Sequence, residues 1–307
     1  KVSMEDYLLI MQIFKLLNNR GMNLSIMDLI KTDICVSLRS DYIDEEETDE
    51  LIDLWDEAID NLSTDKMKDF LIDYMTVFKE GSERIREQQL LELVKETYIQ
   101  TRQDIEEFLE NMKTYSKYYR EIINTDLSLN DNILEKRCNN ILRRLGNLNI
   151  TQGRALILGV YSEVRDTSRE REELLFETLK TIENLSFRLS LTPASPSKFE
   201  KIYPILCEGF RREREDMDVS TRLIEEFHSG VGDSIFGETL FDYIIGDWKD
   251  KQAKQMFRKL LSEDFEQESE DMVRLELSAS DSKVHLEHIF PKKPIPDEPL
   301  PDWEDRF

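Results

Sequence analysis

The chain has 307 residues, of which 39% are hydrophobic and 35% are charged. This composition is typical of a soluble globular protein, and the length is enough for two or three domains of ordinary size. No apolar run approaches the roughly 20 residues of a membrane-spanning helix, so we expect no membrane partner. The formal net charge of −24 argues against a DNA-binding surface spread over the whole chain, because such surfaces need excess lysine and arginine. The acidity also keeps a long helical protein soluble.

The three cysteines are Cys35, Cys138 and Cys207, and their spacing matches neither a zinc site nor a disulfide framework. Each lies in a hydrophobic helical pattern, which predicts buried free thiols. The chain opens directly inside an amphipathic pattern without a signal peptide, so we expect a cytoplasmic protein. The start without an initiator methionine predicts that the chain is part of a longer protein.

Apolar side chains recur every three or four positions over residues 4–17, which predicts a first helix that ends in a turn at residues 18–21. Ser3 with Asp6 resembles a capping box at the start of the first helix, and Ser25 with Asp28 predicts the start of a second helix, which continues to Leu38. An acidic stretch at residues 41–50 precedes the next helix, where negative charge suits the helix dipole.

Further helices are predicted at 65–79, 84–99, 101–122, 131–146, 152–164, 169–190 and 198–212. Their expected start signals and breaks are Ser63, Thr101 with Asp104, Asp131, Pro193, Pro196 and Pro204. Tyrosines and phenylalanines follow the same helical spacing, which predicts a core and not a base-stacking platform.

The pattern changes near the C-terminus, after a helical region at 238–261. Residues 272–277 alternate apolar and charged side chains, and residues 284–289 form a short apolar-rich run, so both segments predict strands. From Pro291 onward, proline and acidic residues predict a loop. The predicted fold class is therefore mainly α, a multi-helix domain with a short β-hairpin near the C-terminus.

Two of the three histidines in the chain, His285 and His288, flank Glu287 in the second predicted strand. Alternation along a strand places His285 and Glu287 on one face and His288 on the other. These residues could simply be polar groups at an exposed strand end. A zinc site is a second interpretation, although neither cysteines nor further histidines lie nearby.

Residues 284–291 read Val-His-Leu-Glu-His-Ile-Phe-Pro, which resembles the His-Ile-Glu-His-Ile-x-Pro motif of HNH (His-Me finger) nucleases. The resemblance implies that the hairpin begins a ββα-metal fold, that His288 is the general base, and that Glu287 is a ligand of Mg²⁺ or Mn²⁺. Phosphodiester cleavage needs both a base and a divalent cation. His285 matches the extra histidine of the family, and its role is open between metal, phosphate and a supporting carboxylate.

Residues 13–31 resemble a second motif, from the GmrS/GmrD type of modification-dependent (type IV) restriction endonucleases. There Asn-x-Arg-Gly is followed by Leu-Ser and Asp-Leu-x-Lys, at the end of a ParB/sulfiredoxin-like domain that binds and hydrolyses nucleotide. The resemblance implies nucleotide-binding or structural roles for Asn18, Arg20, Gly21, Asp28 and Lys31. The alternative is a plain helix-turn-helix corner capped by Asn18 and Ser25.

The two motifs stand in the order of that family, with helices between them. The resemblance implies the end of the nucleotide-binding domain at 1–40, a helical middle domain at 41–225 and the incomplete start of the HNH domain at 226–307. The implied protein is a phage-defence DNA endonuclease, gated by an NTP and by DNA modification, with phage or modified DNA as partner; a homodimer is compatible with it.

The upstream Gln-Arg motifs of the family and the later Asn and His of the HNH trio are absent from the sequence. We therefore expect this chain alone to be catalytically incomplete. Two other interpretations stay open: a non-enzymatic helical scaffold or regulatory adaptor, and a nucleotide-driven toxin that acts on RNA.

Overall fold

The computed structural model describes residues 25–40, 45–147, 149–165, 169–190, 199–213 and 218–231. The chain divides into two units, Lys1–Leu240 and Phe241–Phe307, and every described residue belongs to the first. In this part of the chain all regular structure is helical, which confirms the mainly α prediction. The predicted hairpin and the helices expected at 4–17 and 238–261 lie outside the described residues. None of the described helices combines the length and apolar character needed to cross a bilayer.

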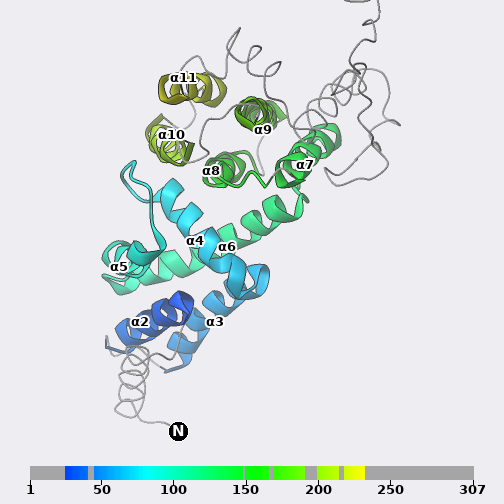
Figure 1. Cartoon of the computed structure of the whole chain (residues 1–307). Coiled ribbons are helices and arrows are strands. Elements are labelled where there is room, and N and C mark those ends of the chain that lie inside the picture. Colours follow the sequence, from blue (N-terminus) through cyan, green and yellow to red (C-terminus); the bar gives the residue numbers. More distant parts are fainter. Residues whose placement is uncertain are drawn as a thin grey trace, which may run out of the picture. The chain divides into compact units, whose positions relative to one another are not determined.

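The helices, drawn in Figure 1, are α2 (Ile26–Ser40), α3 (Glu45–Leu62), α4 (Thr64–Phe78), α5 (Glu87–Tyr98), α6 (Arg102–Asn124), α7 (Asn132–Asn147), α8 (Arg154–Val164), α9 (Arg169–Ser190), α10 (Phe199–Glu213) and α11 (Val219–Val231).

Helix α6 begins where its sequence signal predicts, because the Thr101 side chain accepts a hydrogen bond from the Asp104 N–H at 3.2 Å. The Asp104 carboxylate in turn accepts from the Thr101 N–H at 3.0 Å, which completes the capping box. Asp131 starts α7 in a related way, since its Oδ1 accepts from the N–H groups of Ile133 and Leu134. Short local signals thus set these helix starts.

Two of the expected boundary residues behave differently from the prediction. Ser63 precedes α4 as expected, but its side chain makes no cap hydrogen bond, because its φ of 65° is far from the extended backbone of an N-cap. Pro204, expected to interrupt the helix predicted at 198–212, lies inside α10, which confirms that helix. The buried side chains of Tyr203, Leu206 and Cys207 hold that turn against its neighbours, so tertiary packing outweighs the proline.

The helices pack as two connected groups (Figure 1). In the first, α2 contacts α3 and α5, and α3 lies along α6. In the second, α8 contacts α9, which also contacts α7 and α11, and α10 packs on α11. Helices α4 and α6 join the groups, since both contact α8 as well as α3. The α2 helix thus packs on helices of the predicted middle domain.

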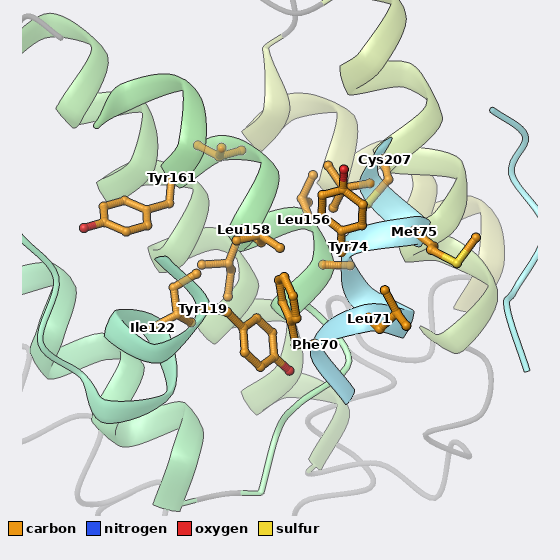
Figure 2. Packing of buried hydrophobic residues seen from close by; sticks show 14 of the residues in the cluster. Phe70, Leu71, Tyr74, Met75, Tyr119, Ile122, Leu156, Leu158, Tyr161 and Cys207 are labelled. Carbon is orange, nitrogen blue, oxygen red and sulfur yellow. The ribbon is translucent and has the colours of Figure 1, made fainter. Parts of the chain in front are cut away.

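An aromatic cluster occupies the contact between α4, α5, α6 and α8. Tyr98 stacks on Phe108 with ring centroids 4.7 Å apart, and Phe70 lies 5.5 Å from Tyr119. Figure 2 shows Phe70, Tyr119 and Leu158 converging from α4, α6 and α8. These rings fill the core, which confirms the prediction from their spacing.

All three cysteines are free and buried, again as predicted. Burial raises the pKa of Cys138 and of Cys207 to about 12. Both thiols therefore stay protonated near neutral pH, and protonated thiols are poor nucleophiles and metal ligands.

Candidate functional site

The predicted nuclease residues His285, Glu287 and His288 lie outside the described residues, and so do Asn18, Arg20 and Gly21. Their roles stay predictions. Among the described residues, no group of three or more His, Cys, Asp and Glu side chains is placed to hold a metal ion.

Asp28 and Lys31 are the two residues of the N-terminal motif that the structure describes. The Asp28 Oδ2 accepts hydrogen bonds from the Ser25 N–H at 3.1 Å and the Ser25 hydroxyl at 2.7 Å, so Asp28 caps α2. The Lys31 Nζ lies 2.5 Å from Asp56 Oδ1 and ties α2 to α3. These contacts give both residues a structural role, while a nucleotide-binding role stays a prediction.

A cleft of about 570 Å³ opens between α4, α6, α8, α10 and the segment that leads into α5. Acidic side chains of α4 and of the first turn of α5 line it, together with three arginines from two separate segments. The charged residues that line it are Asp69, Asp73, Glu87, Arg84, Arg86 and Arg154, and Tyr119 adds a hydroxyl group.

Side chains of α4, α6 and α8 lie close together in this cleft. The buried Tyr119 hydroxyl donates a hydrogen bond to Asp73 Oδ2 at 2.7 Å, and the positive charge of Arg154 acts on both groups. Burial raises the pKa of Asp73 to about 7, against the lowering effects of the Tyr119 hydrogen bond and the Arg154 charge. Asp73 therefore titrates near physiological pH, which is a property of many functional carboxyls.

The segment that carries Arg84 and Arg86 is held in place from α10. Arg211 donates hydrogen bonds to the carbonyl oxygens of Thr76 at 2.8 Å and Val77 at 2.7 Å. It also donates to the Gly81 carbonyl at 2.6 Å, where the chain turns with a φ of 104° that suits glycine. One arginine thus satisfies the end of α4 and fixes the start of the loop.

A second, smaller cavity of about 370 Å³ lies near the end of α6 and is strongly polar. Arg165 Nη1 lies 2.5 Å from Glu121 Oε2, and both side chains are nearly buried, at 13% and 11% exposure. The Tyr161 hydroxyl donates to the same oxygen at 2.6 Å and accepts from the Ser128 N–H at 3.0 Å. Since these buried polar groups satisfy one another, the network has a structural explanation.

No protein-family model, no curated protein and no solved structure matches this chain. The family resemblance therefore rests on the two sequence motifs.

Proposed function

We propose that this chain belongs to a metal-dependent DNA endonuclease of the phage-defence restriction class, with His288 as its general base. The observation that carries the proposal is the string at residues 284–291, in which two histidines and a glutamate precede Ile-x-Pro. The second string, at residues 13–31, stands upstream in the expected order, with a helical unit between the two.

The residue types suit the reaction. A neutral imidazole such as His288 can take a proton from water near neutral pH. The Glu287 carboxylate offers the hard oxygen that Mg²⁺ or Mn²⁺ prefers, and His285 could support the metal or the phosphate. A bound divalent cation would neutralise charge on the phosphate and on the leaving oxygen.

The helical unit supports a gating role for an NTP. Helix α2 carries Asp28 and Lys31 from the nucleotide-domain motif, and it packs directly on α3, α4, α5 and α6. A shift of α2 on nucleotide binding or hydrolysis would therefore act on the core of the helical unit. Packed helices transmit such shifts well because their interiors are dense.

The test uses the natural full-length protein with supercoiled DNA and Mg²⁺. His288→Ala should lower nicking and cleavage by about 10²–10⁴-fold, the usual contribution of a general base. His228→Ala is the matched control, because His228 is the remaining histidine of the chain and is exposed on α11. Glu287→Gln should lose activity that additional metal partly restores, and nucleotide hydrolysis should persist in both variants.

Full cleavage by the His288→Ala protein would reject the nuclease assignment and favour a non-enzymatic scaffold. One observation favours that second candidate: α3 presents a row of acidic side chains to solvent. They are Glu46, Asp49, Glu50, Asp53, Asp56, Glu57 and Asp60. Such a face would suit a basic protein partner and would repel DNA.

A further inference from the structure

We propose that the cleft between α4, α8 and the segment leading into α5 binds a small phosphorylated ligand of nucleotide size. The proposal concerns the helical unit alone and does not depend on the nuclease assignment. The cleft volume of about 570 Å³ lies within the range of about 300–1,000 Å³ that is usual for small-molecule sites.

The first argument is the convergence of three guanidinium groups. Arg84 and Arg86 come from the segment before α5, and Arg154 comes from the first turn of α8, yet all three line one cleft. Asp69, Asp73 and Glu87 line the same cleft, so its formal charge is balanced in a protein that carries 65 acidic and 41 basic residues. Guanidinium groups bind phosphate oxygens through paired hydrogen bonds, which makes phosphate the expected anion.

The second argument is the positioning of Arg154. Arg154 is half-buried in the first turn of α8, and its charge lies close enough to Asp73 and Tyr119 to act on both. Partial burial restricts the Arg154 side chain at the cleft wall. Preorganised donors bind an anion better than mobile surface arginines, since little conformational entropy is lost on binding.

The other lining residues indicate what else the ligand must carry. Asp69, Asp73 and Glu87 can accept hydrogen bonds from hydroxyl or amino groups, and Ile72 with Ile85 offers apolar surface. Asp69 and Glu87 would repel a bare phosphate ion. A ligand with a phosphate at one end and a sugar or planar ring at the other satisfies both sets of residues, as a nucleotide does.

A photoreactive probe tests the site directly in the natural full-length protein. 8-Azidoadenosine triphosphate should label peptides that contain residues 69–88 or 151–155 after irradiation, as mapped by mass spectrometry. AMP should compete with the labelling at lower concentration than inorganic phosphate does. Peptide mapping separates this site from any nucleotide site near residues 13–31.

Gln88 provides a pair of variants that change the cleft charge without touching the buried network. Gln88 is exposed and lines the cleft, whereas its exposed neighbour Gln89 does not. Gln88→Lys should lower the half-saturating probe concentration about two- to fivefold, and Gln88→Glu should raise it by a similar factor, from the Coulomb energy of one added charge. Gln89→Lys and Gln89→Glu are the matched controls and should leave labelling unchanged.

Labelling that is absent from these peptides, or equal in the two Gln88 variants, would overturn the proposal. Competition by a short DNA strand but not by AMP would reject a small ligand. Unchanged labelling in the His288→Ala protein is expected in either case, so the failure of the nuclease assignment would leave this site intact.

Discussion

Asp73 places a carboxyl group where its charge is costly. The side chain is half-buried, and its direct partner is the Tyr119 hydroxyl, a neutral donor. Arg154 favours the charged form, but Asp69 opposes it, and burial outweighs the remaining effects. The carboxyl therefore keeps its proton in the folded protein up to a pKa of about 7, compared with 3.8 for an ordinary aspartate.

We predict that Asp73→Asn stabilises the protein at high pH. The folded protein holds this proton to a higher pH than the unfolded chain does, so wild-type stability should fall as pH rises from 3.8 to about 7. The amide has no charge to desolvate and can still accept from Tyr119. The variant should therefore melt about 2–6 °C above the wild type at pH above about 7.5, an effect of about 1–2 kcal/mol. The two proteins should converge near pH 4, and an equal difference at both pH values would reject this account.

At this scale the sequence predicts local contacts well and distant ones poorly. The pairing of Asp28 with Ser25, three residues away, predicts a helix cap, and the structure confirms it. Asp73 depends on Tyr119, which lies 46 positions further along the chain. The available signal is an acidic residue inside the apolar run of residues 70–75, where a solvated position would be unusual. Its partners cannot be identified without the fold.

At the scale of the element, α8 is a buried helix that contacts four others. Every residue from Ala155 to Tyr161 is buried, and the neighbours of α8 are α4, α6, α9 and α10. Because α8 shows no polar face, the sequence pattern predicts a helix there but does not indicate which side of it faces which neighbour. Gly159 lies at the closest approach, because a Cβ there would come within 2.9 Å of the Val77 side chain and 3.3 Å of Phe210.

A pair of glycine variants should separate helix propensity from packing. Gly159→Ala should destabilise the protein by about 1–3 kcal/mol, because the added methyl group overpacks the contact of α8 with α4 and α10. Gly146→Ala makes the same chemical change in α7, where no atom lies within 4 Å of the new Cβ. It should stabilise by about 0.5–1 kcal/mol through helix propensity. Urea unfolding of both variants provides the measurement, and a stabilised Gly159→Ala protein would contradict the packing argument.

Helix boundaries follow from sequence where the signal is a local hydrogen bond, as at Thr101 and Asp131. A local signal fails where long-range packing decides, as at Pro204, which does not interrupt α10. The cleft also depends on long-range packing. Its residues come from α4, α6, α8, α10 and the segment before α5, and no periodic pattern joins them.

At the scale of the whole molecule, the protein carries a net charge of −24, from 65 acidic and 41 basic residues. The described ion pairs are mostly exposed, as for Lys31 with Asp56 and Lys113 with Glu57. Exposed pairs contribute little to stability, about 0–1 kcal/mol each. Salt screens these pairs, and the resulting loss of stability is therefore small. Repulsion among the excess carboxylates acts over longer distances, and it opposes the compact state. Added salt weakens both the favourable ion pairs and the unfavourable repulsion, so its two effects on stability oppose each other. We expect the weakened repulsion to have the larger effect.

We therefore predict that salt stabilises this protein. Raising NaCl from about 50 mM to about 500 mM shortens the Debye length from about 14 Å to about 4 Å, so distant carboxylates no longer repel one another. The melting temperature should rise by about 3 °C or more. A variant with Glu50→Gln and Asp53→Asn, both on the exposed acidic side of α3, should melt higher than the wild type at low salt and gain less from added NaCl. A melting temperature that falls with NaCl would mean that the ion pairs outweigh the repulsion, and the acidic face of α3 would then not destabilise the fold.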